Sequence, residues 1–164
     1  MKEIILLLNT LNFANLDLLA VGVTIAAIGL LGFIVYISNT GSITSFSFLL
    51  FCAITMLWSF FNYLSYQGED QIITLWLLRG VIFLGVWHSF SFFNFLYVFP
   101  LEKKQIPFWY KFLVFPSVCL VSLLTLSPFI FSGLESAATS ESGPKAHVEA
   151  GIAIFLLTVF ILIV

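Results

Sequence analysis

Long apolar runs separated by short polar segments constrain this chain more than any other feature. Four runs, over residues 16–36, 43–64, 72–99 and 108–131, are long enough to cross a hydrocarbon core, which takes about 20 apolar residues in a helix. A fifth run, over residues 150–164, would form only about 22 Å of helix against a core of about 30 Å. We therefore predict an all-α integral membrane protein with four complete transmembrane helices and the start of a fifth, and we interpret the chain as an N-terminal fragment.

The composition excludes the common soluble classes. Of the 164 residues, 61% are hydrophobic and only 9% are charged, whereas soluble domains carry about 25% charged residues. A soluble fold of this size could not bury so much apolar surface. The formal net charge of −2, with six Lys and Arg in total, offers no basic face for nucleic acid. The lipid bilayer is the partner that this composition predicts.

The chain divides into a short lead-in and a membrane domain. Residues 1–15 hold an apolar stretch shorter than the core of a signal peptide, and three asparagines interrupt the segment. We expect an interfacial lead-in there and a transmembrane domain over residues 16–164. Within that domain, residues 134–148 are rich in Ser, Thr, Gly and Pro, which favours a loop.

The lysines predict the orientation. The 101–107 connection together with Lys111 holds three of the six positive residues. Because positive residues are enriched in cytoplasmic loops, this connection should be cytoplasmic and the N-terminus should lie outside. Trp109 and Tyr110, at the inner edge of the fourth run, should then anchor to lipid headgroups.

Small residues in the first run predict close helix packing. Gly22, Ala26 and Gly29 follow one another at spacings of four and three, so they share one face of a helix. Small residues let helix backbones approach closely in lipid. They indicate a packing face within the bundle, and a homodimer interface is the alternative.

A weakly polar stripe runs along the second apolar run. Cys52, Thr55, Ser59 and Asn62 lie at i, i+3, i+7 and i+10, on one side of a helix. Polar groups in lipid face the bundle interior, where they find hydrogen-bond partners. The stripe therefore predicts either hydrogen bonds between helices or one wall of a ligand or water cavity.

The third run carries the other candidate sensing or structural residues. Arg79 lies two turns from its outer end, so its guanidinium could reach the outer headgroups or pair with Asp17 on the first run. His88 lies about half a helical turn around from Arg79, and we expect either a titrating group or a neutral, hydrogen-bonded imidazole. Asn94 is the other strongly polar residue at that depth.

Motifs for chemistry are missing from the sequence. It contains no G-x-x-x-x-G-K-[ST], no G-x-G-x-x-G and no H-E-x-x-H. His147 and Glu149 are too few to hold a metal ion, and Cys52 and Cys119, each within an apolar run, are typical packing residues. We assign no catalytic, cofactor-binding or metal-binding residue, and we expect no enzymatic activity in this chain.

Several segments in order carry a family resemblance. Asn15-Leu16 opens a first run rich in small residues, WSFFNYLSY from Trp58 ends the second, and the third contains LLRGVIFLG from Leu77 and FFNFLYVFP from Phe92. In these segments the chain resembles the N-terminal seven-transmembrane-helix sensor region of bacterial histidine kinases. It departs from that pattern in the middle of the third run, where VWHS from Val86 lacks a proline.

The resemblance implies a signal-input region. It covers four helices and the start of a fifth of a seven-helix bundle in the bacterial cytoplasmic membrane, with the N-terminus outside. It further implies a dimeric two-component signalling protein that responds to an unidentified small molecule or physical signal, with kinase activity C-terminal of Val164. No ligand-binding residue follows from the resemblance.

Two other classes remain as alternatives. A piece of a small-molecule transporter or channel would be expected to show broken helices and an internal repeat. Here the prolines lie near the ends of the apolar runs and no repeat is evident. A structural membrane protein without any signalling output is the third interpretation.

Overall fold

The computed structural model describes residues 13–67, 70–99, 107–128, 131–136 and 146–150. It contains the helices α2 (Phe13–Ser38), α3 (Ile43–Gln67) and α4 (Gln71–Val98), then the π-helical segment η1 (Tyr110–Val114), which continues into α5 (Phe115–Thr125). Two short strands, β1 (Phe131–Ser136) and β2 (Ala146–Ala150), complete the described elements.

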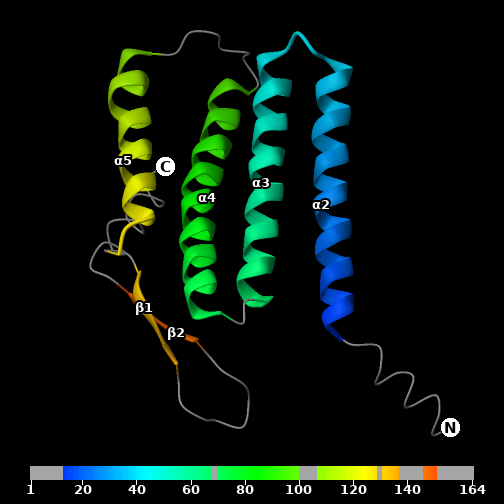
Figure 1. The fold of residues 1–164 in the computed structure, drawn as a ribbon. Helices are drawn as coiled ribbons and strands as arrows, with labels where there is room; N and C mark the ends of the chain where they lie inside the picture. Colours follow the sequence, from blue (N-terminus) through cyan, green and yellow to red (C-terminus); the bar gives the residue numbers. More distant parts are fainter. Residues whose placement is uncertain (1–12, 68–69, 100–106, 129–130, 137–145, 151–164) are drawn as a thin grey trace, which may run out of the picture.

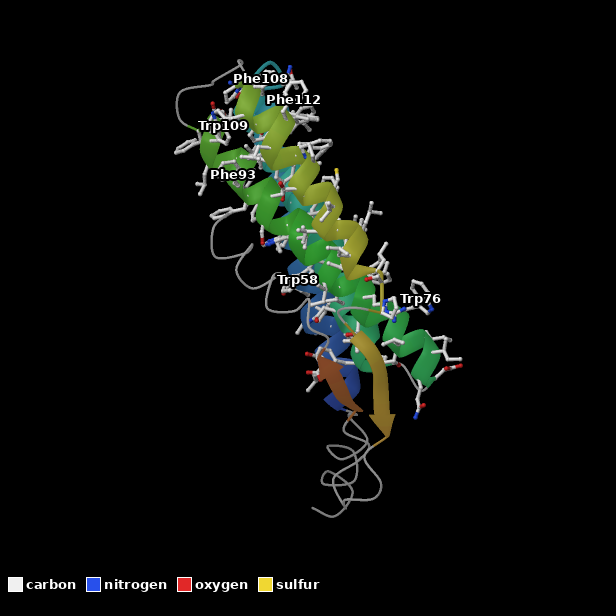
Figure 2. The ribbon with its side chains drawn as sticks, turned by 90° about the vertical axis from the view of Figure 1, so that its left-hand side faces the viewer. Trp58, Trp76, Phe93, Phe108, Trp109 and Phe112 are labelled. Carbon is white, nitrogen blue, oxygen red and sulfur yellow. The ribbon has the colours of Figure 1, made fainter. Side chains whose placement is uncertain are left out.

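The helices stand side by side in the order α2, α3, α4 and α5, each antiparallel to the next (Figure 1). In the perpendicular view they overlap in a narrow band, so they form a single layer (Figure 2). The helices α2, α3 and α4 are long and apolar enough to cross a membrane. The mainly helical fold and these three predicted spans are therefore confirmed at the level of length and composition.

Aromatic side chains mark both ends of this layer. Phe108, Trp109 and Phe112 lie at one end and Trp76 lies toward the other, all of them exposed (Figure 2). Such rings suit the interface between lipid and water. The prediction that Tyr110 also anchors there was wrong, since Tyr110 is only 7% exposed and packs against α4.

The first three predicted runs differ from the helices only at their ends. The first helix begins at Phe13, so the last residues of the expected lead-in are helical, while residues 1–12 lie outside the described part of the chain. The second helix continues to Gln67. The third begins at Gln71 because the Asp70 side chain caps it, accepting a hydrogen bond from the Ile72 N–H at 2.8 Å.

The fourth predicted run was too long. Its helix ends at Thr125 instead of continuing to residue 131. Pro128 supplies no backbone N–H and disfavours helical geometry at the residue before it. The hydroxyl of Ser127 accordingly donates to the Leu124 carbonyl, and the Leu126 N–H closes a tighter turn on the Leu123 carbonyl.

The predicted loop over residues 134–148 was also wrong in part. Strands β1 and β2 pair antiparallel, with Leu134 opposite Val148 and Ser136 opposite Ala146. The pairing gives backbone groups their hydrogen-bond partners where Ser and Gly make a helix unfavourable. The hairpin therefore departs from an all-α fold. Of the expected fifth run over residues 150–164, the first residue, Ala150, ends β2, and residues 151–164 lie outside the described residues.

The cluster of buried hydrophobic side chains lies between α4 and the segment formed by η1 and α5. Val86 and Val118 are fully buried, and Phe90 and Tyr110 complete the buried cluster. Within η1 the Phe115 N–H donates to the Tyr110 carbonyl five residues back. This wide turn precedes Pro116, whose ring would clash with a carbonyl in a regular helix, so the π-turn gives the proline room.

Candidate functional site

The α2–α3 interface is tight at one end. A Cβ on Gly32 would lie 2.8 Å from the Cβ of Cys52, and a Cβ on Gly29 would lie 2.8 Å from the sulfur of Met56. Both distances are too short for packed atoms, so glycine lets the backbones approach here. The predicted face of Gly22, Ala26 and Gly29 is therefore only partly right, because a Cβ on Gly22 would meet nothing within 4 Å and Ala26 is exposed.

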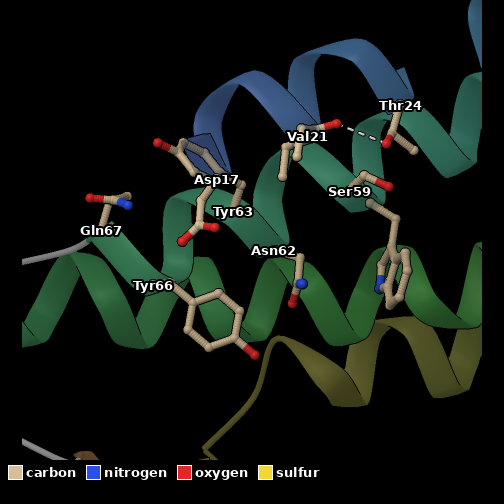
Figure 3. Close-up of a pocket in the computed structure, with 10 residues that line it drawn as sticks. Asp17, Val21, Thr24, Ser59, Asn62, Tyr63, Tyr66 and Gln67 are labelled. Atoms are coloured by element: carbon tan, nitrogen blue, oxygen red, sulfur yellow. Dashed lines mark hydrogen bonds between the residues drawn. The ribbon is translucent and has the colours of Figure 1, made fainter. Parts of the chain in front are cut away.

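The same two helices leave a pocket at their other end. It has a volume of about 430 Å³ and lies between the first turns of α2 and the last turns of α3 (Figure 3). Its described lining residues are Asp17, Ala20, Val21, Thr24, Trp58, Ser59, Asn62, Tyr63, Tyr66 and Gln67. From Gln67 to Trp58 the pocket follows α3 for about 14 Å, from the helix end toward its middle.

Polar side chains in this pocket are available to a ligand. Figure 3 shows the Asp17 carboxylate extending from α2 toward α3, where Asn62 and Tyr66 lie. Thr24 donates its hydroxyl to the Ala20 carbonyl of its own helix at 2.8 Å. Among the described residues, none provides a hydrogen-bond partner for the side chains of Asp17, Ser59 or Asn62.

The weakly polar stripe of α3 is divided between two environments. Cys52 is buried against Gly32, while Ser59 and Asn62 line the pocket. Thr55 donates to the Phe51 carbonyl of its own helix at 2.7 Å, so it makes a bond within one helix and not between helices. Of the two predictions for this stripe, the cavity wall describes the half that holds Ser59 and Asn62.

Trp58 connects the pocket to α4. Its ring lines the pocket and also stacks on His88, with centroids 5.7 Å apart and planes 26° apart. The Trp58 Nε1 lies 3.7 Å from where a Cβ on Gly85 would stand. His88 also packs against Phe51, with centroids 5.0 Å apart. The half-buried imidazole therefore lies in an aromatic setting between α3 and α4.

The structure does not bring the expected pair Arg79 and Asp17 together. Asp17 lines the pocket between α2 and α3, and α3 separates α2 from α4 (Figure 1). Arg79 is only 8% exposed, which also differs from an arginine that reaches outward to lipid headgroups. Its Cζ atom lies 5.1 Å from the Trp76 ring centroid, a cation–π geometry within α4.

Asn94 belongs to a separate contact near the opposite end of the layer. Tyr110 donates its hydroxyl to the Asn94 Oδ1, and the Asn94 Nδ2 donates to the Phe90 carbonyl at 3.0 Å. Tyr110 also packs against the rings of Phe90, Phe93 and Tyr97 on α4. These contacts fix α5 to α4, so Asn94 has a structural role in this arrangement.

Sequence reasoning identified some pocket residues and missed others. The sequence pattern indicates Asp17, Ser59 and Asn62 as candidates, whereas it assigns Trp58, Tyr63 and Tyr66 to a segment of family resemblance and to no site. Trp58, Asn62 and Tyr66 lie at i, i+4 and i+8, so they share one side of α3, and this spacing could have linked the two rings to Asn62.

Comparison with family models, curated proteins and solved structures finds no match to this chain.

Metal binding has no support in the described part of the chain. No group of three or more His, Cys, Asp or Glu side chains within it could hold a metal ion. The described lining residues of the pocket instead combine one carboxylate, two amides, hydroxyl groups and aromatic rings. This set can bind an organic molecule by charge, hydrogen bonds and ring contacts.

Proposed function

We propose that the chain is the membrane-embedded signal-input region of a sensor protein, of the kind found in bacterial histidine kinases. One observation carries the proposal: a partly polar pocket of about 430 Å³ opens between two apolar helices and ends at an aromatic contact with a third. Pockets of this size hold small molecules. The sequence resemblance to the sensor region supports the same function.

The pocket suggests how a signal could reach the rest of the bundle. A molecule bound beside Trp58 would favour the orientations of the indole ring that leave space for that molecule. The same ring stacks on His88 of α4. A ligand shifts a conformational equilibrium only by its difference in affinity for the two states. Because Trp58 contacts both the pocket and α4, binding would bias how α3 packs on α4.

The orientation expected from the lysines places this pocket toward the outer side of the membrane. The first turns of α2 and the last turn of α3, which line the pocket, lie at the end of the layer where α4 begins, opposite the end where α4 finishes and α5 begins (Figure 1). An external molecule would then enter from the outer side, and the response would leave through the cytoplasmic end. This is the direction that a sensor of external conditions requires.

The test is to express the complete reading frame of the native gene. Autophosphorylation of its product is then measured in membrane vesicles with labelled ATP. The proposal expects phosphate incorporation that depends on the sensor region, so that Trp58→Ala alters the rate while the protein level stays the same. A product that transports solutes in liposomes and incorporates no phosphate would overturn the proposal in favour of the transporter interpretation.

A further inference from the structure

The pocket between α2 and α3 has a charge that selects among ligands. Asp17 is the one charged side chain among its described lining residues, and the other described lining residues are uncharged. A carboxylate beside apolar helices attracts a positive group more strongly than the same carboxylate in water. The electrostatics therefore favour a cation over a neutral or anionic molecule.

Aromatic rings in the same pocket favour an organic cation over a metal ion. Trp58, Tyr63 and Tyr66 all line it. Ammonium groups bind over the faces of such rings, with tryptophan the strongest. A small metal ion would instead need several oxygen, nitrogen or sulfur ligands, and the described residues contain no cluster of three or more acidic, His or Cys side chains.

The size of the pocket and its hydrogen-bonding groups indicate what the rest of the ligand would be. The pocket volume of about 430 Å³ lies in the range of sites for small organic ligands. Ser59 and Asn62 present hydroxyl and amide groups with no partner among the described residues. A hydroxyl or carbonyl group on the ligand would satisfy them.

We propose that this pocket binds a small organic ammonium ion that carries a hydrogen-bonding group, with Asp17 and the aromatic rings holding the charge and Asn62 the polar group. The proposal names the ligand class for the pocket described above. It rests on the proposed function only for the consequence of binding, and the binding itself can be measured without any signalling output.

Calorimetric titration of the full chain in lipid nanodiscs tests this proposal. The probes are tetramethylammonium, choline and benzyltrimethylammonium, together with 3,3-dimethylbutan-1-ol, which has the shape of choline without its charge. We expect at least one ammonium probe to bind and choline to bind about tenfold or more tightly than its neutral isostere. Equal affinity for the two, or no binding of any ammonium probe, would overturn the proposal.

Two aspartates at the same end of the layer give a matched pair of variants. Asp17→Asn should weaken ammonium binding about tenfold because it removes the carboxylate from the pocket. Asp70→Asn should leave binding unchanged, since Asp70 caps α4 and asparagine caps a helix as well as aspartate does. Equal losses in both variants would indicate a general surface-charge effect and contradict a site at Asp17.

Tryptophan fluorescence in the same titration locates the bound probe. A cation beside the pocket should change the emission of the parent chain, and Trp58→Phe should remove most of that change while Trp109→Phe keeps it. A response that survives in Trp58→Phe would overturn the proposed position. Calorimetric binding with no change in autophosphorylation would contradict the sensor function and leave the ammonium site intact.

Discussion

The α2–α3 and α4–α5 interfaces use opposite means to hold two apolar helices together. Between α2 and α3, glycines remove side chains so that the backbones approach, and the helices leave a pocket at the other end. Between α4 and α5, large rings surround Tyr110 and fill the space. The comparison teaches that close approach at one point leaves a pocket of about 430 Å³ elsewhere, whereas the rings around Tyr110 leave a smaller one of about 230 Å³ beside them.

Removing the ring at the centre of the filled interface should have the largest effect. Tyr110→Ala should destabilise the packing of α5 on α4 by about 3 kcal/mol, because a buried ring and its neighbours lose their contacts. Thermal unfolding followed by a thiol-reactive dye at Cys119, on α5, would measure the loss in a Cys52→Ala background.

Trp109→Ala is the matched control for this variant. Trp109 is adjacent in sequence but exposed, so its loss should cost far less than that of Tyr110. Equal destabilisation by the two variants would show that α5 is held by its exposed rings, and the contrast between the two interfaces would fail.

Adding one carbon to the close interface should have the next largest effect. In Gly32→Ala the new Cβ meets the Cβ of Cys52, which has no flexible end to move, so we expect a loss of about 2 kcal/mol. Gly29→Ala should cost less, since the Met56 thioether can rotate away. The alkylation rate of Cys52 in a Cys119→Ala background would report how far α2 and α3 separate.

An unchanged Cys52 alkylation rate in Gly32→Ala would contradict the close approach of α2 and α3. The expected order of rates is Gly32→Ala above Gly29→Ala above the parent chain. This order distinguishes backbone contact from contact with a flexible side chain at the same interface.

The hydrogen bond from Tyr110 of η1 to Asn94 of α4 should contribute less than either packing feature. Tyr110→Phe removes its donor and Asn94→Leu removes its acceptor. Hydrogen bonds between membrane helices contribute about 0.6 kcal/mol on average. A double-mutant cycle from thermal unfolding should therefore give a coupling of about 0.6 kcal/mol, and strictly additive losses would show that the bond contributes nothing.

The smallest effect should come from Gly22, on the same helix as Gly29 and Gly32. A Cβ there meets nothing within 4 Å, and alanine favours a helix over glycine, so Gly22→Ala should change stability by less than about 0.5 kcal/mol. Chemical crosslinking and thermal unfolding would check this. A clear loss of stability or of crosslinked dimer would place Gly22 at an interface between two copies of the chain.

The sequence predicted the apolar helices well because length and hydropathy determine them. Three helices lie within a few residues of the predicted runs. The fourth helix and the hairpin were harder, since the effect of Pro128 and of strand pairing depends on local geometry that apolar content does not record.

The candidate site was predictable only in part. Asp17 and Asn62 stood out as polar groups in apolar runs, and both line the pocket. The position of both residues in one pocket could not be inferred, because it requires knowing that α2 packs on α3 through Gly29 and Gly32 and leaves a pocket at the other end. The expected pairing of Asp17 with Arg79 failed for the same reason, since neighbour order in the layer is set by packing.

The π-turn at the start of α5 determines which residues of that helix face α4. In a regular α-helix, Tyr110 and Val118 would point about 80° apart, since each residue turns the chain by about 100°. The wide turn between the Tyr110 carbonyl and the Phe115 N–H absorbs one residue and brings the two side chains to within about 20° of one direction. Both are buried in the same cluster. The π-turn thus sets the phase of the helix: making it a regular α-helical turn without removing a residue would turn Val118 about 80° from the direction of Tyr110, whereas deleting one residue within 111–114 would keep the two side chains aligned.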